Sequence, residues 1–391
     1  MPLLATAWET GAAVLPIDER LPGTAASQLI ERAHATVVIA ADRTQRLADP
    51  AEHDEDLLAV VATSGSTGEP RLVELTRDAV AAAVTASAEM LGSAAADPWL
   101  LCLPPAHIGG MLVLWRHIIL GAPVELRAFS VDAMAGATDA RFASLVPTQL
   151  RRLLDAGIDL SRFRAILVGG AGVPSDLASA AAAHGVSVVT TYGLTESCGG
   201  VVYSGRTLPG TSVRIANGGE VQIAGPTLMR GYRSDPAATA AAFTDDGWLR
   251  TRDAGAIGSD GVLTVHGRLD DAILSGGETV WPLAVEAALA SHPQVADVGV
   301  TGWDDDEWGQ RVVAFVVPRD AAAAPTLAAL REHVARRLPR YMAPRELLIT
   351  DMLPRTTHDG QGGKVRRDVL RRATGGRSHG AHWPPERPGS A

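Results

Sequence analysis

Short apolar runs alternate with helix-like stretches over the first two thirds of the chain. Several runs are apolar throughout, as strands are when both faces of a sheet are covered; they span residues 36–40, 57–62, 99–103, 123–126, 164–168 and 186–190. The stretches between them that indicate helices span residues 77–91, 109–120, 147–156 and 175–184. Alternating strands and helices predict an α/β domain with a largely parallel sheet.

The pattern changes near residue 201. Short strands separated by Gly, Asp and Pro follow, typical of β-hairpins; they span residues 212–216, 219–224, 248–251, 254–257 and 261–266. After residue 268 the pattern indicates a small α+β unit, with helices at 282–292 and 325–338 and strands at 295–301 and 311–318. We therefore predict a large α/β domain with a β-rich subdomain over residues 1–268, a small C-terminal domain over 271–374, and a disordered tail over 375–391.

Composition narrows the class of protein. The chain has 391 residues, of which 46% are hydrophobic and 20% charged, which is ordinary for a globular protein. A net charge of −9 argues against a nucleic-acid partner or an anionic membrane surface. Two cysteines cannot form a disulfide framework, which favours a reducing compartment. The longest apolar region, residues 100–122, is too interrupted by proline, histidine and arginine to span a bilayer. We expect a cytoplasmic protein without membrane insertion.

One basic residue stands apart from the others. Lys364 is the only lysine among 35 basic residues, the rest being arginine. A genome that favours arginine codons accounts for the excess but not for the exception. A site that accepts only a compact ammonium would retain one lysine, because arginine is a broad planar fork. Chance survival as a solvated surface lysine is the alternative.

Two segments that follow apolar strands carry candidate phosphate chemistry. Small residues and hydroxyls after the strand at 57–62 can bring backbone and side-chain donors close to a polyphosphate; they are Thr63, Ser64, Gly65, Ser66, Thr67 and Gly68. The alternative for this segment, given equal weight, is a flexible polar loop that binds no ligand. The second segment, Thr191-Tyr192-Gly193-Leu194-Thr195-Glu196, ends the strand at 186–190. Loops at the carboxyl ends of parallel strands are where α/β sheets bind ligands, and Glu196 offers a hard oxygen ligand for Mg²⁺.

Two further segments complete an ordered set. The third contains Thr251-Arg252-Asp253, then Gly267-Arg268-Leu269-Asp270-Asp271, then Gly276-Gly277-Glu278. The fourth ends in Gly362-Gly363-Lys364. Each is weak alone, but the four in this order resemble the adenylate-forming superfamily of acyl- and aryl-CoA ligases, adenylation domains and luciferases. The resemblance covers roughly residues 57–370. It implies an ATP-dependent reaction in which a carboxylate gives an acyl-adenylate and a thiol, usually that of coenzyme A, then displaces AMP.

The resemblance also implies roles for individual residues. Residues 63–68 would hold pyrophosphate, Gly170-Ala171-Gly172 and Tyr192-Gly193 would form the adenine and acyl-group wall beside Thr191, and Thr195 would contact the α-phosphate. Glu196 would bind Mg²⁺, Asp253 the ribose hydroxyls, and Arg268 the ribose and phosphate. The small domain would be mobile about a hinge at Asp270, with Gly276, Gly277 and Glu278 on the coenzyme A side. Lys364 would reach the acyl-phosphate oxygens, where a preorganised ammonium stabilises developing charge.

Two local sequences narrow the resemblance further. Residues 103–110, Leu-Pro-Pro-Ala-His-Ile-Gly-Gly, and residues 192–203 are similar to the compact actinobacterial o-succinylbenzoate–CoA ligases of menaquinone biosynthesis. This implies an aryl pocket lined by His107, Gly109, Gly170, Tyr192, Gly193 and Gly199. The expected ligands are a small aromatic carboxylic acid, ATP, Mg²⁺ and coenzyme A. A hydrogen-bonded loop histidine is the alternative for His107, and a homodimer is left open.

Two departures from the family pattern keep alternatives open. Arg71-Leu72 stands where the family usually has Lys-Gly, and extra residues around 358–361 lengthen the loop before Lys364. The chain could be a ligase for another aromatic acid in secondary metabolism, or a stand-alone adenylation enzyme that loads a carrier protein. A nucleotide-binding protein with impaired catalysis is the alternative from a different class. Retention of Lys364, Glu196 and Asp253 argues against it.

Overall fold

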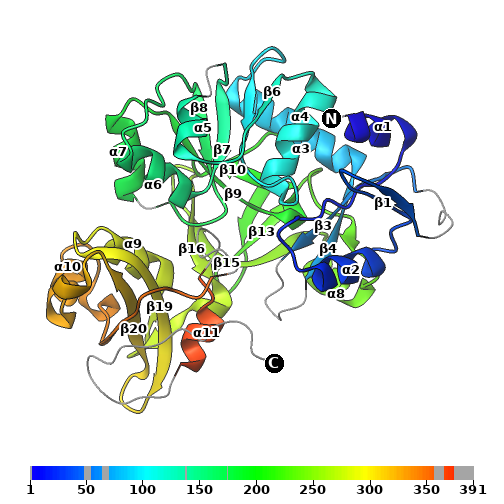
Figure 1. Cartoon of the computed structure of the whole chain (residues 1–391). Coiled ribbons are helices and arrows are strands. Elements are labelled where there is room, and N and C mark those ends of the chain that lie inside the picture. The colour runs from blue at the N-terminus through cyan, green and yellow to red at the C-terminus, as the bar shows by residue number, and fades with distance from the viewer. Residues whose placement is uncertain are drawn as a thin grey trace.

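The computed structural model describes residues 2–47, 54–63, 70–136, 139–173, 175–355 and 365–373. A large body of stacked sheets and helices carries the N-terminal two thirds, and a smaller body in yellow and orange lies beside it (Figure 1). Strands β15 (Leu249–Ile257) and β16 (Leu263–Arg268) lead from the first body to the second. The mixed α/β fold class is the predicted one.

A seven-stranded sheet forms the centre of the large body. Its strand order is β11-β10-β9-β8-β7-β5-β6, and its pairs β9-β8, β8-β7, β7-β5 and β5-β6 are parallel. The strands are β5 (Trp99–Leu101), β6 (Val124–Leu126), β7 (Phe142–Leu145), β8 (Ala165–Val168), β9 (Val188–Leu194), β10 (Gly199–Tyr203) and β11 (Arg206–Thr207). The predicted parallel sheet is confirmed for this part of the chain.

Helices cover both faces of that sheet. Leu100, Ala143 and Ile166 pack with α5 (Val131–Ala135), α6 (Pro147–Asp155) and α7 (Ser175–Ala183). The neighbouring positions Trp99 and Phe142 face α3 (Arg77–Leu91) and α4 (Ile108–Leu120). Successive strand residues point to opposite faces, so a strand buried on both sides must be apolar at every position. This explains the unbroken apolar runs in the sequence.

Two predicted strands lie outside the parallel sheet. β3 (Leu57–Thr63) pairs antiparallel with β4 (Arg71–Thr76), and β14 (Gly231–Tyr232) completes this three-stranded sheet. β1 (Val37–Ile39) pairs only with β2 (Thr44–Arg46) and is largely exposed. The prediction of a parallel setting was therefore wrong for residues 36–40 and 57–62. β3 is buried against two hydrophobic clusters, and burial gives the same apolar pattern in either strand direction.

The β-rich subdomain is a four-stranded antiparallel sheet in the order β12-β13-β15-β16, so the predicted antiparallel hairpins are present. Its first two strands are β12 (Ser212–Ile215), at one edge, and β13 (Glu220–Ala224), which lies between β12 and β15. The prediction of two separate strands at 248–251 and 254–257 was wrong, because both lie in the single strand β15. The register between β13 and β15 is irregular, because two steps along β13 from Glu220 to Gln222 match four steps along β15 from Arg250 to Ala254. Extra residues on one strand of a pair form a β-bulge.

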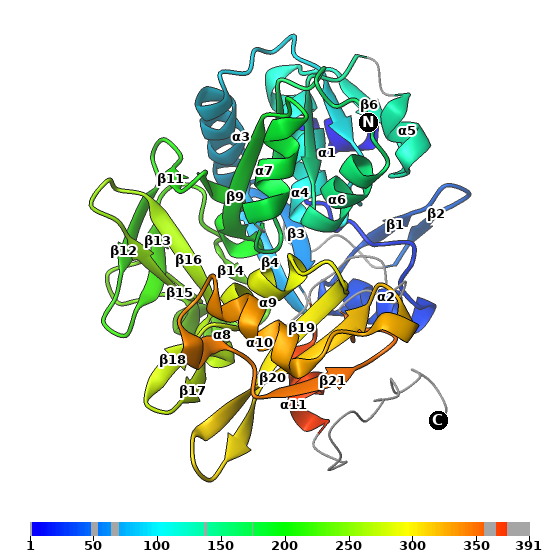
Figure 2. The same cartoon turned by 90° about the vertical axis from the view of Figure 1, so that its left-hand side faces the viewer.

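The smaller body has its own sheet and core. The strands are β17 (Ile273–Ser275), β18 (Glu278–Val280), β19 (Val295–Asp305), β20 (Gly309–Pro318) and β21 (Glu346–Ile349). Helices α9 (Pro282–Ala290) and α10 (Leu327–Ala335) pack on one face of this sheet, and α11 (Arg367–Arg372) packs on the other (Figure 2). The predicted α+β unit is thus present, and its boundary at residues 268–271 stays a prediction.

The remaining helices are short. They are α1 (Pro2–Thr10), α2 (Gly23–Arg32), α8 (Pro236–Ala242), and the 3-10 turns η1 (Thr195–Ser197), η2 (Leu269–Asp271), η3 (Ala321–Ala323) and η4 (Arg340–Met342). Across the described ranges, every helix falls short of the length and apolarity needed to cross a bilayer. The predicted tail, residues 375–391, lies outside the described residues.

Candidate active site

The carboxylate of Asp253, on β15, accepts hydrogen bonds from side chains of two other strands. Tyr192, on β9, donates its hydroxyl to Asp253 Oδ2 at 2.9 Å. Arg268 Nη1, on β16, donates to Asp253 Oδ1 at 3.2 Å and to the carbonyl of Thr251 at 2.9 Å. The residues are 61 and 15 positions from Asp253 in the chain. The structure therefore brings together three residues that the sequence placed at the nucleotide. We call these three residues the Asp253 corner.

The carboxylate of the Asp253 corner is buried, and its strand is held by neighbouring backbone and hydroxyl contacts. Asp253 is 9% exposed and pairs directly with Arg268 in the β15-β16 ladder. Its backbone N–H donates to Thr251 Oγ1 at 3.1 Å, and that hydroxyl donates to the Val221 carbonyl on β13 at 2.6 Å. Burial first, and the Asp253 charge second, raise the pKa of Tyr192, so its hydroxyl stays protonated. The carboxylate can still accept further hydrogen bonds, such as those of a ribose.

The turn between β9 and β10 requires glycine at two positions. A Cβ on Gly193 would stand 1.9 Å from the Gly199 carbonyl oxygen, and one on Gly199 would stand 2.7 Å from Leu112 of α4. Gly199 also has φ 86°, and Cys198 before it has φ 54°. Bare backbone at these positions lets Tyr192 and Thr195 sit on a tightly closed hairpin. Gly199 therefore lies against α4, the helix that follows His107.

Glu196 is positioned by a tyrosine that the sequence analysis missed. Tyr232, on β14, donates its hydroxyl to Glu196 Oε1 at 2.9 Å, and Arg71 stacks over the Tyr232 ring at 5.0 Å. Burial, then the Glu196 charge, raise the pKa of Tyr232 to about 12. The Met229 N–H fixes the Glu196 backbone through its carbonyl at 2.8 Å. Arg71, the departure from the family pattern, thus contributes a cation next to Glu196's partner.

The donor set around Glu196 suits magnesium held jointly with phosphate. Within the described ranges, no three His, Cys, Asp or Glu side chains gather into a metal cage. Mg²⁺ is usually bound by one or two carboxylates together with the phosphates of its nucleotide. A single carboxylate with one oxygen fixed by Tyr232 fits that mode, and Glu196 would be the protein ligand.

The loop after β8 faces the start of β9. Gly170, Ala171 and Gly172 are exposed, and Gly170 has φ 80°. A Cβ on the preceding Gly169 would stand 2.1 Å from Thr191 Oγ1, so this loop approaches β9 closely. Leu283, at the start of α9 in the smaller body, lies 4.0 Å from where a Gly172 Cβ would be. The predicted adenine wall therefore lies close to the smaller body.

His107 caps the N-terminus of α4 with its backbone in an extended conformation and without a side-chain capping bond. Desolvation lowers the pKa of His107, with opposing contributions from Asp18, which raises it, and Arg20, which lowers it. A cavity of about 320 Å³ beside it is lined by Pro16, Ile17, Asp18, Glu19, Pro105 and Ala106. Gly109 lies in the first turn of α4, and a Cβ on this residue would stand 3.4 Å from Leu103. His107 is therefore an exposed residue that follows two cavity-lining residues, Pro105 and Ala106, and it is not part of the packed core.

Part of the predicted site lies outside the described residues. This holds for Ser64, Gly65, Ser66, Thr67, Gly68 and Lys364. Thr63, the last residue of β3, donates to the Arg71 carbonyl across the hairpin at 3.4 Å. In the smaller body, Arg355 and Val365, the described residues before and after residues 356–364, form an isolated β-bridge, and the Arg355 guanidinium pairs with Asp297 at 2.7 Å. The roles assigned to residues 64–68 and to Lys364 stay predictions.

The predicted hinge and coenzyme A loop lie on the connection to the smaller body. Asp270 is in η2 and pairs with Arg252 at 2.7 Å. Gly276 and Gly277, with φ 62° and 84°, form the tight turn of the β17-β18 hairpin before Glu278, and all three are exposed. A Cβ on Gly276 would stand 2.8 Å from the Trp308 ring. These four residues are not part of the Asp253 corner.

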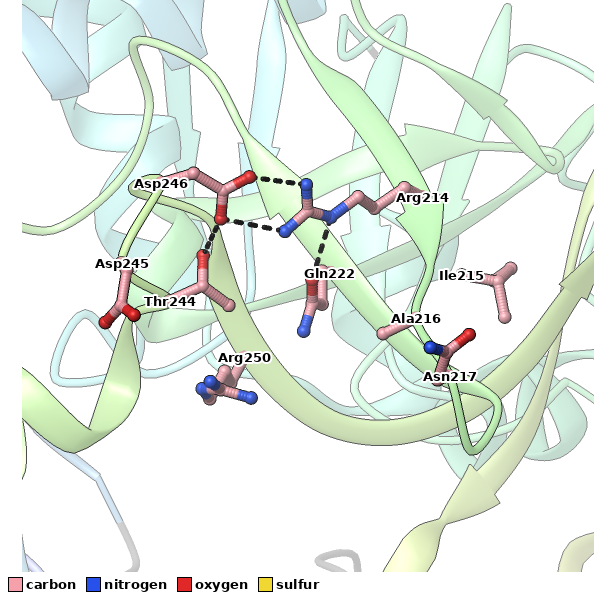
Figure 3. Close-up of a pocket in the computed structure, with 9 residues that line it drawn as sticks. All are labelled: Arg214, Ile215, Ala216, Asn217, Gln222, Thr244, Asp245, Asp246 and Arg250. Atoms are coloured by element: carbon pink, nitrogen blue, oxygen red, sulfur yellow. Dashed lines mark hydrogen bonds and ion pairs between the residues drawn. The ribbon is translucent and has the colours of Figure 1, made fainter.

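A separate polar cavity opens on the β-rich subdomain (Figure 3). It measures about 490 Å³ and is lined by Arg214, Ile215, Ala216, Asn217, Gln222, Thr244, Asp245, Asp246 and Arg250. Arg214 forms a two-pronged ion pair with Asp246, at 2.6 and 3.0 Å, and donates to Gln222 at 2.8 Å. These contacts engage Arg214, Asp246 and Gln222 with one another. The cavity shares none of its lining residues with the predicted site.

Comparison with known proteins identifies the family. Residues 3–233 match the AMP-binding enzyme family, and residues 284–359 match the AMP-binding enzyme C-terminal domain. A probable 2-succinylbenzoate–CoA ligase of Mycobacterium tuberculosis is 44% identical over 340 residues, covering 82% of this chain and 86% of the relative. An o-succinylbenzoate CoA synthetase from Bacillus subtilis, in complex with the acyl-adenylate intermediate OSB-AMP, has a TM-score of 0.74 at 31% identity, covering 82% of this chain and 72% of that one.

The Bacillus subtilis protein in complex with ATP and magnesium ion gives a TM-score of 0.73 at 31% identity over 80% of this chain and 69% of that one. Matches to both domain descriptions, in the expected order, cover well over half of the sequence. The chain therefore belongs to the family of AMP-binding enzymes.

Proposed function

We propose that this protein is an ATP-dependent acid–thiol ligase that converts o-succinylbenzoate to o-succinylbenzoyl-CoA, a step of menaquinone biosynthesis. In the first half-reaction, a carboxylate oxygen of the acid attacks the α-phosphorus of ATP, the bond to the bridging oxygen breaks, and pyrophosphate leaves. In the second, the thiol of coenzyme A attacks the acyl carbon, and AMP leaves as the new thioester forms.

The Asp253 corner, in a chain related to 2-succinylbenzoate–CoA ligases over most of its length, is the observation that carries this proposal. A buried carboxylate fixed by a phenol and a guanidinium presents acceptors and a cation at one point. That combination suits a ribose, whose hydroxyls donate, attached to a phosphate, whose oxygens accept. The named relatives, with their acyl-adenylate and ATP complexes, support the same ligands here.

The described residues would divide the work as follows. Asp253 accepts from the ribose hydroxyls, and Arg268 stays paired with it while facing the phosphate side. Glu196, oriented by Tyr232, would hold Mg²⁺, which neutralises phosphate charge when bound. His107 borders the acid's pocket at the start of α4. Gly276 and Gly277 would form a turn without side chains, followed by Glu278, beside the path of the incoming thiol.

The direct test is turnover. Incubation of the purified chain with o-succinylbenzoate, ATP, Mg²⁺ and coenzyme A should release AMP and form o-succinylbenzoyl-CoA, detected by mass spectrometry. Benzoate and salicylate serve as comparison acids, and a phosphopantetheinyl carrier protein replaces coenzyme A in a parallel reaction. Absence of thioester with o-succinylbenzoate, alongside turnover of another acid or of the carrier, would overturn the substrate assignment.

Lys364→Ala separates the half-reactions. We expect adenylation, measured by pyrophosphate release without coenzyme A, to fall by about 10²–10³-fold, because a preorganised donor to the developing charge is removed. Thioester formation from supplied acyl-adenylate should change far less. Equal losses in both half-reactions would contradict the role given to Lys364.

We also propose that the enzyme acts in the cytoplasm and forms a homodimer. The cytoplasm supplies both ATP and coenzyme A, and both cysteines, Cys102 and Cys198, are buried free thiols, as suits a reducing compartment. Light scattering coupled to size-exclusion chromatography tests the dimer. A monomer mass at micromolar concentration would refute that part of the proposal.

A further inference from the structure

Arg252 occupies a backbone conformation that favours glycine. It has φ 59° and lies in the bulge of β15, between Arg250 and Ala254. Bulges of this kind commonly place glycine in the left-handed region, because a Cβ crowds the backbone there. The bulge turns Asp253 inward, while the Arg252 N–H is held by Glu220 Oε1 at 3.0 Å. A glycine would serve this turn equally well, so the arginine side chain calls for its own explanation.

The Arg252 side chain reaches the connection to the smaller body. Its Nη2 donates to Asp270 Oδ2 at 2.7 Å, and the two side chains are 56% and 57% exposed. Asp270 follows Arg268, the cation of the Asp253 corner, by two residues. The ion pair therefore joins the strand that carries the candidate ribose ligand to the segment through which the chain leaves for the smaller body (Figure 1).

The next residue, Asp271, is held from the opposite side. Arg367 Nη1 pairs with Asp271 Oδ2 at 3.2 Å, and Arg371 lies 3.6 Å from Oδ1. Arg367 also donates to Glu286 of α9 at 2.5 Å and to the Val300 carbonyl at 3.2 Å, so it belongs firmly to the smaller body. Its side chain is only 13% exposed. The Asp270 carboxylate thus pairs with an exposed arginine of the large body. The neighbouring Asp271 carboxylate pairs with a largely buried arginine of the smaller body.

We propose that Arg252 is a positioning residue that holds the smaller body in its present orientation to the Asp253 corner. The exposed Arg252–Asp270 pair is the contact that yields when residues 269–271 turn, whereas the Arg367–Asp271 pair travels with the smaller body. The inference rests on the proposed function only for its kinetic consequence. When the smaller body is held less firmly, the rates of adenylation and of thioester formation change by different factors.

The experiment measures orientation directly. Spin labels are placed at Arg206→Cys on the large body and Asp306→Cys on the smaller one, both exposed positions, while the native cysteines are buried. Distances between the labels are compared for the parent, Arg252→Gly, Arg252→Lys and Asp270→Asn. Arg214→Gln is the matched control, since it breaks an exposed ion pair between β12 and the turn before β15, both in the large body (Figure 3).

We expect a broadened or shifted distance distribution in Arg252→Gly and Asp270→Asn, and a parental one in Arg252→Lys and Arg214→Gln. The ratio of the two half-reaction rates should change by up to about fivefold in the first two variants, as suits loss of one exposed ion pair. Combining Arg252→Gly with Asp270→Asn should add little, since both remove one interaction.

Parental distances and an unchanged rate ratio in Arg252→Gly and Asp270→Asn would overturn the proposal, as would an equal effect of Arg214→Gln. A merely structural role would lower both half-reactions together and leave the ratio constant. The two levels of inference fail separately. If the parent forms no thioester, the proposed function fails, while the distance measurement still decides the role of Arg252.

Discussion

Arg252 and Asp253 are neighbours on β15, yet their side chains lie in opposite environments. Asp253 is 9% exposed and accepts hydrogen bonds from two other strands, whereas the Arg252 side chain is 56% exposed and, among the residues that the structure describes, forms an ion pair with Asp270. A buried charge with fixed partners is costly to disturb. An exposed pair contributes about 0–1 kcal/mol and is easily broken. One strand therefore combines a rigid binding corner with a contact weak enough to open.

Among changes at the Asp253 corner, Asp253→Asn should have the largest effect on kcat/KM for ATP. The amide keeps the shape but removes the charge that Arg268 faces, and its NH₂ cannot accept from Tyr192 or a ribose. Because hydrogen bonds to charged groups contribute about 1.5–3 kcal/mol, kcat/KM for ATP should fall by about 10- to 100-fold. Pyrophosphate exchange at varied ATP measures it. Asp246→Asn, in the separate cavity, is the control; a loss below threefold for Asp253→Asn would mean that the corner does not bind ATP.

Tyr192→Phe should have a smaller effect. It removes one hydroxyl from Asp253 while the Arg268 contact remains, so we expect at most about a tenfold fall in kcat/KM for ATP. The raised pKa of Tyr192 means that this hydroxyl stays a donor across the working pH range. The same exchange assay applies. A loss as large as that of Asp253→Asn would show that the tyrosine, rather than the carboxylate, dominates the corner.

Sequence alone went far where local pattern determines structure. Residues 77–91 were predicted as a helix and form α3 over the same span, because Thr76 caps its N-terminus and Gly92 ends it in the left-handed conformation. Doubly covered strands were recognised from their unbroken apolar runs. β4 was missed, because Arg71 and Leu72, at its start, were considered only as a departure from the family pattern. The direction of β3 was wrong, because burial leaves no mark of strand direction.

The candidate site divides in the same way. Asp253, Arg268, Tyr192 and Glu196 were predicted because they stand in ordered motifs; their roles stay predictions, while the family assignment that rested on those motifs is confirmed. Tyr232 and the Arg252–Asp270 pair were missed. Tyr232 lies 36 residues from Glu196, and Arg252 lies 18 from Asp270, so only the folded chain brings each pair together. A positive φ at an arginine leaves no local pattern either.

Arg252→Gly should sharpen the comparison through stability. A residue with a Cβ in the left-handed region costs about 1–2 kcal/mol, and loss of an exposed pair costs about 0–1 kcal/mol. We therefore expect the free energy of unfolding to stay equal or to rise by up to about 2 kcal/mol, measured by urea denaturation. Arg252→Ala loses the pair but keeps the Cβ, so it should show no gain. A clearly destabilised glycine variant would mean that the arginine stabilises the bulge itself.

Salt should have the smallest effect and should separate the two sides of β15 without any change of sequence. At 1 M ionic strength the screening length is about 3 Å, against about 10 Å at 0.1 M, so the exposed Arg252–Asp270 pair weakens, while the Asp253–Arg268 pair, whose carboxylate is only 12% exposed, is screened less. Between these two concentrations, the spin-label distances of the parent should move towards those of Arg252→Gly, and those of the variant should stay constant. An equal response in both proteins would place the salt-sensitive contact elsewhere between the two bodies, and Arg252 would then be an exposed arginine with no part in their orientation.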